Sequence, residues 1–323
     1  MLSAVMRTFR NTWPGSGSKR LGNGKRRPRL LRRRSPLIGR IQRAPGLSAF
    51  GISILVVLIT ALSHSAWAAS GTTIRIGGVG SALGAMRLLG DAFETSHPSV
   101  RVNVLPSIGS AGAVGAVNRG AIDIGLTGRP LQERERVLGL RVFEYARSPF
   151  VFVSNMDVIP DNITLEMVAE IYRGEFSHWP DGTRVRPVIR PQNDSDTLLL
   201  QEMSPKVKEA VDIAVSHSGY ARALTDQENA DMIQKIPGSF GTSTLTQVVA
   251  EKRYLRIFRL EGVAPGIKTL ADGSYRFYKR FFIVTRPAPS DVVGEFIAFL
   301  ESPEGRKLLE SSGNIVVKPT LSR

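Results

Sequence analysis

The segment TTIRIGGVGSALGAMRLLGDAFETSHPSVRVNVLP, residues 72–106, decides the fold class. It opens with a short apolar run that ends in glycines, which is typical of a buried strand followed by a turn. A helical pattern follows, with Ser81 as its predicted cap and one apolar face made of Leu83, Met86, Leu89, Ala92 and Phe93. Residues 99–106 then alternate apolar and polar side chains, which predicts a second strand.

The same order of strand, glycine turn and helix continues to residue 313. The segment TLEMVAEIYRG, residues 164–174, predicts a helix that Thr164 caps and Gly174 ends. A helix over 197–215 is expected to break near Pro205. Strands that alternate with helices at this spacing indicate an α/β fold with mainly parallel sheets. Further strands are predicted within 121–131, 150–153, 185–191, 236–248 and 275–286, and terminal helices within 289–313.

The net charge of +15 belongs to the N-terminal part of the chain. Residues 1–69 hold 13 of the 43 Lys and Arg and none of the 28 Asp and Glu. The remaining chain therefore has 30 basic and 28 acidic residues, a net charge of only +2. A nucleic-acid-binding domain needs a basic face, so we expect no nucleic-acid partner.

Residues 1–68 are predicted to be a basic leader that ends in a secretory signal peptide. Basic residues such as Arg43 precede the apolar run 49–62, and small residues stand at Ala66 and Ala68. We expect cleavage after Ala68 and a periplasmic location. The apolar run of about 14 residues is shorter than the roughly 20 that span a bilayer, although an uncleaved anchor remains an alternative.

The chain contains no cysteine, which excludes disulfides, thiolate metal sites and cysteine nucleophiles. His97, His178 and His217 lack metal-ligand spacing, so no metal, cofactor or catalytic residue is expected. Gly78, Gly80 and Gly84 roughly fit a dinucleotide-binding turn. That motif needs an acidic residue at the end of the second strand, and the predicted strand has none.

Three predicted helix starts share one design for binding an anion. They lie at Ser81–Ala82, at Ser110 and at Asp194–Thr197, each with small or hydroxyl residues. Helix N-termini present free N–H groups and a positive dipole end, and Arg190 adds a planar guanidinium beside the third. Micromolar affinity needs about 8 kcal/mol, whereas one charge-assisted hydrogen bond contributes roughly 1.5–3 kcal/mol. Several helix starts must therefore act together; the alternative is that each is an ordinary turn or cap.

Three segments resemble the periplasmic phosphate-binding proteins of ABC transporters, within the type II periplasmic binding protein superfamily. They are ITLEMVAEIYRGEFSHWPDG (163–182), SIGSAGAVGAVNRGAIDIGLTGRPL (107–131) and FIAFLESPEGRKLLESSGNIVV (296–317). The likeness spans residues 72–318. It implies two Rossmann-like α/β lobes with mainly parallel sheets, joined by a two-strand hinge with a ligand cleft between them. Lobe 1 would comprise 70–152 plus 248–323, and lobe 2 would comprise 153–247.

The resemblance also implies a function: an exported protein, without catalysis, that captures phosphate for uptake by a membrane ABC permease and acts as a monomer. Alternatives are an oxyanion scavenger or a sensor of phosphate status, a sulfate, molybdate or tungstate binder, and an enzyme on the same scaffold. The ligand-binding positions it implies are Ser81, Ala82, Ser110, Thr127, Arg190, Ser195, Asp196 and Thr197.

Two departures from the family pattern concern the ligand. The family places an aspartate after the strand that ends here in Leu126–Arg129, where this sequence has no carboxylate. The third helix start carries two, Asp194 and Asp196. We hypothesise that Asp196 accepts the proton of a protonated oxyanion; the alternative is that it only caps the helix. If Arg129 lines the cleft, it would favour a more highly charged anion.

Overall fold

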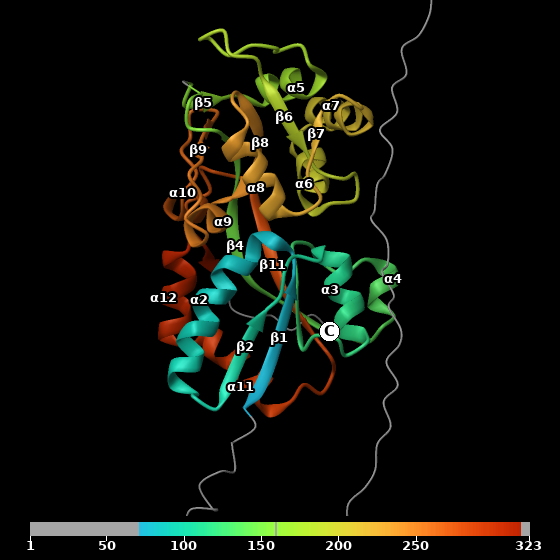
Figure 1. The fold of residues 1–323 in the computed structure, drawn as a ribbon, viewed down its shortest axis with the longest axis vertical. Helices are drawn as coiled ribbons and strands as arrows, with labels where there is room; N and C mark the ends of the chain where they lie inside the picture. The colour runs from blue at the N-terminus through green and yellow to red at the C-terminus, as the bar shows by residue number, and fades with distance from the viewer. Residues whose placement is uncertain (1–70, 159, 318–323) are drawn as a thin grey trace, which may run out of the picture. The chain divides into compact units, whose positions relative to one another are not determined.

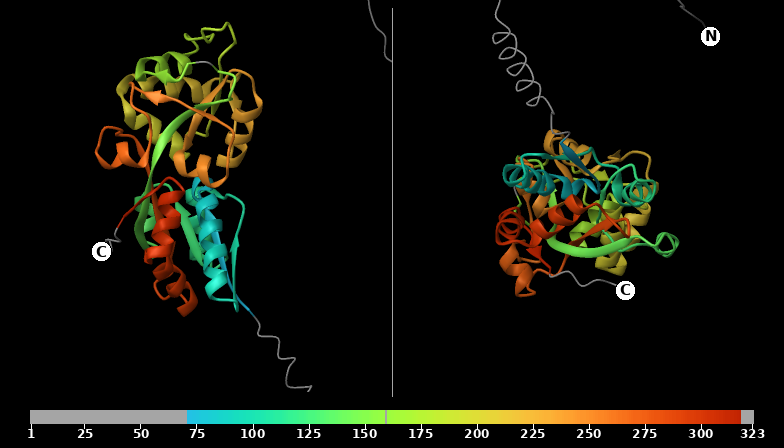
Figure 2. Two further views of the ribbon diagram at one scale, coloured as in Figure 1. Left: turned by 90° about the vertical axis from the view of Figure 1, so that its left-hand side faces the viewer. Right: turned by 90° about the horizontal axis from the view of Figure 1, so that it is seen from below.

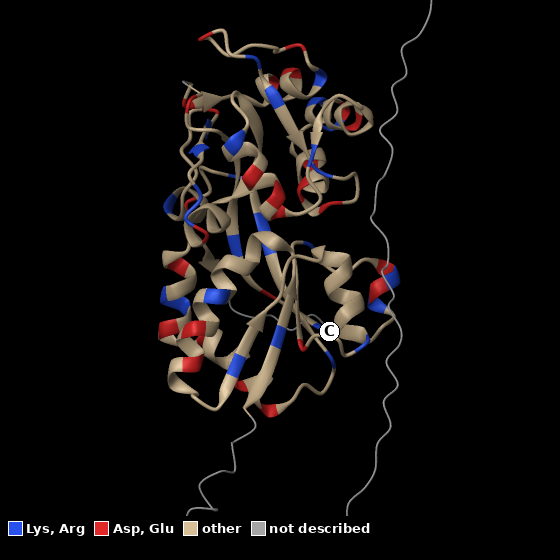
Figure 3. Cartoon of the chain, viewed as in Figure 1, with Lys and Arg blue, Asp and Glu red and all other residues tan. Residues whose placement is uncertain are grey.

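The computed structural model describes residues 71–158 and 160–317 (Figure 1). The predicted leader and its cleavage after Ala68 lie outside the described residues. Within the described part of the chain, no helix is both long and apolar enough to cross a membrane. Figure 3 shows acidic and basic residues interspersed over the helices and strands in that view.

The helices are α2 (Gly80–Ser96), α3 (Gly109–Asn118), α4 (Glu133–Arg136), α5 (Leu165–Arg173), α6 (Ser195–Met203), α7 (Pro205–Ser216), α8 (Asp226–Lys235), α9 (Leu245–Ala250), α10 (Ile267–Ala271), α11 (Asp291–Glu301) and α12 (Pro303–Ser311). The strands are β1 (Thr72–Gly78), β2 (Val100–Val104), β3 (Ile124–Thr127), β4 (Arg141–Ser154), β5 (Asn162–Ile163), β6 (Arg186–Ile189), β7 (Ala221–Arg222), β8 (Ser239–Thr244), β9 (Arg256–Ile257), β10 (Arg259–Leu260), β11 (Tyr278–Thr285) and β12 (Ile315–Val316).

The first lobe is built on β1, which pairs in parallel with β2 and β3. Helices α2, α11 and α12 pack on one face of this sheet, where Phe93, Phe296 and Leu309 belong to one apolar core. Helix α3 covers the other face through Val114 and Val117 (Figure 1). The short apolar runs of the sequence are buried because both faces of these strands are covered.

The second lobe is built on β6, which pairs in parallel with β7 and β8. A core that contains Trp179 and Phe240 lies on the side of α5, α6 and α7. On the other side, Ala230 and Ile233 of α8 pack against Val188 of β6. The predicted α/β class is therefore confirmed in both lobes.

Strand β4 is shared by the two lobes. Its first part pairs with β11 and β12, whereas residues 150–154 pair with β8 and β9. Figure 2 shows this long green strand running between the two halves. The segment that enters β11 crosses beside it, since Phe150 N donates to Phe277 O at 3.0 Å. Strands β4 and β11 pair antiparallel with each other, and β11 also pairs antiparallel with β3 of the first lobe. The predicted parallel pairing is found among β1, β2 and β3 and among β6, β7 and β8.

Some of the predicted helix ends agree with the structure and others do not. Thr164 caps α5 and Gly174 ends it with φ of 80°, as predicted. The break near Pro205 is also confirmed, because Ser204 caps the new helix α7. Ser81 is not a cap: Val79 takes that position and Ser81 lies in the first turn of α2. Helix α8 was not predicted from the sequence.

The segment after residue 247 packs differently from the prediction. Phe258, Leu260 and Tyr275 belong to the core of the second lobe, whereas the sequence placed everything beyond 247 in the first. We therefore propose that the second lobe extends to about residue 277 and that the chain returns to the first lobe in β11.

Candidate functional site

Arg190 is held at the end of β6 by its own segment of chain. Asp194 caps α6 by accepting from Asp196 N at 2.9 Å, and its other oxygen accepts from Arg190 Nη2 at 2.8 Å. A second guanidinium nitrogen, Nη1, donates to Ala223 O at 3.0 Å. Burial would lower the pKa of Arg190, but nearby carboxylates outweigh it and raise the pKa. The guanidinium therefore stays charged although only 5 % of Arg190 is exposed.

Asp196 is not the cap of α6; it faces a buried lysine. Lys279, on β11, forms an ion pair with Asp196 Oδ1, and both side chains are almost fully buried. The hydroxyl of Thr242 donates to the other carboxylate oxygen at 3.4 Å. Burial, reinforced by the neighbouring Asp226 and Asp194, raises the pKa of Asp196 to about 6 although Lys279 opposes the shift.

Asp226, the first residue of α8, joins this cluster from the second lobe. Its Oδ2 accepts from the backbone N–H of Gly80, at the start of α2, at 2.8 Å. The same oxygen lies 3.9 Å from Arg190 Nη2, and Oδ1 lies 3.7 Å from Lys279 Nζ. Burial alone would raise the pKa of Asp226, but the two cations and the amides of Gly80 and Ser81 lower it. The carboxylate is therefore ionised and surrounded by donors.

The buried cluster has two cations, Arg190 and Lys279, and three carboxylates, Asp194, Asp196 and Asp226. Its formal charge is −1 when all five groups are ionised. The arrangement can hold one monoanionic group at the start of α2. A dianion in that place would add a further negative charge in a buried site, which is costly.

The serines and threonines predicted at the site have different surroundings. Ser81 Oγ is buried and has no hydrogen-bond partner among the residues that the structure describes, and Ala82 is buried next to it. Ser110 Oγ accepts from Gly128 N at 3.0 Å, so the start of α3 is joined to the turn after β3. Thr127 Oγ1 donates to Arg129 O at 2.8 Å and Thr197 Oγ1 to Arg190 O at 3.4 Å. The hydroxyls of Thr127 and Thr197 thus donate to backbone carbonyls nearby in the sequence.

Arg129 lines the same cavity as Ser195 and Lys279, but its guanidinium is already paired. Its guanidinium forms two hydrogen bonds to Glu135 of α4, at 2.7 and 2.8 Å, and one to Pro130 O at 2.9 Å. It is therefore a positioning group for the turn after β3 and not a free cation for a ligand.

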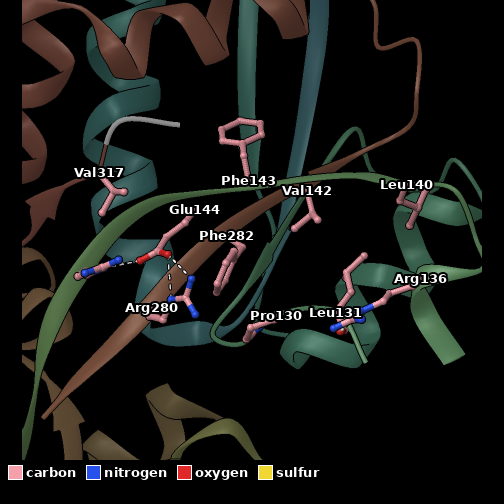
Figure 4. Close-up of a pocket in the computed structure, with 11 residues that line it drawn as sticks. Pro130, Leu131, Arg136, Leu140, Val142, Phe143, Glu144, Arg280, Phe282 and Val317 are labelled. Atoms are coloured by element: carbon pink, nitrogen blue, oxygen red, sulfur yellow. Dashed lines mark hydrogen bonds and ion pairs between the residues drawn. The ribbon is translucent and has the colours of Figure 1, made fainter. Parts of the chain in front are cut away.

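A cavity of about 580 Å³ opens beside the cluster, with Gly128, Ser195 and Lys279 in its wall. A larger cavity of about 700 Å³ lies in the first lobe between β4, β11 and α4 (Figure 4). There Glu144 binds Arg280 and Arg147 above an apolar floor that includes Phe282. None of the predicted ligand-binding residues lines the larger cavity, so the ion-pair cluster is the candidate site.

Two residues of the cluster, Asp226 and Lys279, were not predicted from the sequence. Lys279 stands beside Arg280 at the start of β11 and is 1 % exposed, and this burial cannot be read from the sequence. Asp226 follows the cap Thr225 and has the pattern of any first-turn acidic residue. In the described part of the chain, no group of three or more His, Cys, Asp or Glu side chains is placed to hold a metal ion.

Comparison with known proteins identifies the fold family. The family model described as "PBP superfamily domain" matches residues 63–304. A Clostridium perfringens structure with bound phosphate, described as a phosphate ABC transporter substrate-binding protein, is similar with a TM-score of 0.66 and 20 % identity, covering 76 % of this chain and 100 % of that one. An ABC-type phosphate transport receptor from Vibrio cholerae has a TM-score of 0.54 at 22 % identity, with coverages of 75 % and 99 %. Reduced OxyR from N. meningitidis reaches 0.52 at 10 % identity, with coverages of 76 % and 99 %.

Proposed function

Because this chain belongs to the PBP (periplasmic binding protein) superfamily, we propose that it is an exported solute-binding protein for a small inorganic oxyanion, with phosphate as the first candidate. No bond is made or broken in this role. The anion is held between the lobes and presented to a membrane ABC permease. The descriptions of two similar structures as phosphate-transport components support this direction.

The observation that carries the proposal is the environment of the Asp226 carboxylate. One oxygen receives the Gly80 N–H and lies near Arg190, and the other faces Lys279. The start of α2 and two buried cations thus surround a single oxyanion group. Such helix starts and guanidinium groups bind phosphate and sulfate in proteins. A ligand that takes this place gains the same donors once Asp226 has moved away.

The charge of the cluster favours a protonated ligand. With Asp194 and Asp196 close by, a monoanion keeps the present charge balance and a dianion does not. An acceptor inside an anion site selects for a ligand that carries a proton. We assign that acceptor role to Asp196, whose carboxylate lies beside Lys279. Dihydrogen phosphate can donate to it, whereas sulfate has no proton to donate at neutral pH.

Calorimetric titration of the purified protein with phosphate, sulfate, molybdate and tungstate tests the proposal. We expect phosphate to bind with a dissociation constant on the order of micromolar, about 8 kcal/mol, and sulfate to bind more weakly. Asp196→Asn should weaken phosphate more than sulfate, because it replaces the charged acceptor by a neutral amide. Absence of heat with all four anions at millimolar concentration would contradict the function, and equal losses for phosphate and sulfate would contradict the role of Asp196.

A further inference from the structure

Two adjacent residues of the second lobe enclose Gly80 of the first. Asp226 accepts from Gly80 N at 2.8 Å, and Gln227 Nε2 donates to Gly80 O at 2.9 Å. Gln227 also donates to Glu251 Oε1 at 2.6 Å, which anchors its amide. The donor and the acceptor of one backbone residue are thus both satisfied across the lobe boundary.

Gly80 fits this contact for a steric reason. Its φ is not in the left-handed region, so the backbone conformation itself does not need glycine. A Cβ at this position would overlap Gln227 Oε1 and would lie 2.7 Å from Asp226 Oδ2. Only a residue without a side chain lets the carboxylate reach the start of α2. The contact therefore depends on both residues: on the carboxylate of Asp226 and on the missing side chain of Gly80.

The start of α2 also carries a buried hydroxyl that could bind a ligand. Ser81 is 1 % exposed, and within 71–158 and 160–317 its Oγ has no hydrogen-bond partner, although buried hydroxyls are normally paired. A carboxylate has two oxygens, and those of Asp226 are taken by Gly80 and by the cations Arg190 and Lys279. A tetrahedral anion has further oxygens to offer, one of which can satisfy the neighbouring hydroxyl.

We infer that Asp226 is an internal occupant of the oxyanion site, which holds the two lobes together without ligand and which an incoming anion must displace. This inference rests on the proposed function and assigns to Asp226 the control of the affinity for the oxyanion. Self-occupation lowers the apparent affinity by the fraction of molecules in which the site is free. A charge-assisted hydrogen bond of this kind corresponds to a reduction on the order of ten- to a hundredfold.

Phosphate titration of Asp226→Asn and Asp231→Asn tests the affinity. Asp231 is the matched control, because it loses the same charge on the same helix α8, where it pairs with Arg253 and is half exposed. We expect Asp226→Asn to bind inorganic phosphate at least tenfold more tightly than the wild type and Asp231→Asn to be unchanged. Equal or weaker binding by folded Asp226→Asn overturns the inference.

A distance measurement separates displacement from a simple charge effect. The chain has no cysteine, so spin labels at Thr95→Cys on α2 and Glu209→Cys on α7 report the distance between the lobes. Without ligand, Asp226→Asn and the steric variant Gly80→Ala should both lengthen this distance, and Asp231→Asn should not. An unchanged distance overturns the inference even if affinity rises. A longer distance with no phosphate binding by any form supports the lobe contact and contradicts the proposed function.

Discussion

Lys279 of β11 and Asp196 of α6 form an ion pair whose side chains are 1 % and 2 % exposed, and whose residues are 83 positions apart in the chain. Lys279 also lies 3.7 Å from Asp226. The ammonium group of Lys279 thus faces two carboxylates of the second lobe, Asp196 and Asp226. Its strand, β11, pairs with β3 of the first lobe. Loss of this cation leaves the carboxylates with Arg190 as their remaining cationic neighbour.

Lys279→Met should therefore be strongly destabilising. Removing one partner of a buried ion pair typically costs about 3–5 kcal/mol, and we expect a loss of unfolding free energy of that order in urea denaturation. Lys206→Met is the matched control, since Lys206 pairs with Glu166 on the exposed surface. Its effect should stay within about 1 kcal/mol. Similar losses for the two variants would show that Lys279 has no special role.

Gly128→Ala, a substitution in the first lobe, is expected to displace the side chain of Lys279. A Cβ there would overlap Lys279 Cε and approach Ser195 Oγ at 3.2 Å. Overpacking of this kind costs about 1–3 kcal/mol, and phosphate affinity should fall with it. In Gly294→Ala a Cβ on helix α11 would meet no atom of the described residues within 4 Å. This control should be neutral or stabilised by up to about 1 kcal/mol, and a destabilised control with an unaffected Gly128→Ala would refute the packing argument.

The raised pKa of Asp196 gives a pH dependence of stability with a defined sign. Its folded pKa of about 6 exceeds the value of about 4 in an unfolded chain. The folded state therefore binds more protons between these values, and this contribution to stability decreases as pH rises from about 4 to about 6. The groups that face Asp196 are Lys279, Asp226, Asp194 and Arg190.

Urea denaturation of the wild type and Asp196→Asn at pH 4.5, 5.5, 6.5 and 7.5 measures this contribution, because the asparagine cannot titrate. The stability of the wild type relative to the variant should fall as pH rises and level off above about pH 7. A difference that grows with pH would mean that the folded pKa of Asp196 is lowered and not raised.

Several helices and strands could be predicted from the sequence because their signals are local. Thr164 and Gly174 lie at the two ends of one helix, and their roles depend on its own backbone. Arg190 and Asp194 are also close in sequence, so their joint location at one helix start could be predicted. The periodicity of residues 72–106 likewise depends on which side chains share a face.

The remaining parts of the site depend on contacts between distant segments. Gly80 and Asp226 are 146 positions apart, and nothing near Asp226 distinguishes it from an ordinary first-turn carboxylate. The prediction of Ser81 as a cap was wrong because α2 begins two residues earlier than that cap implies, at Gly80 after the cap Val79. The boundary at 247 was implied by the family resemblance, and we propose a later one. The short strands β9 and β10 carry too little pattern to show which core they join.

The most direct test of the central claim, that the cluster around Arg190 binds the oxyanion, is the phosphate affinity of Arg190 variants measured by calorimetry. We predict that Arg190→Ala and Arg190→Lys weaken binding at least about a hundredfold, near 3 kcal/mol, since lysine lacks the fork of donors. Arg75→Ala, which breaks the Arg75–Asp123 pair away from the cluster, should bind like the wild type. Folded Arg190 variants with wild-type affinity would contradict the account.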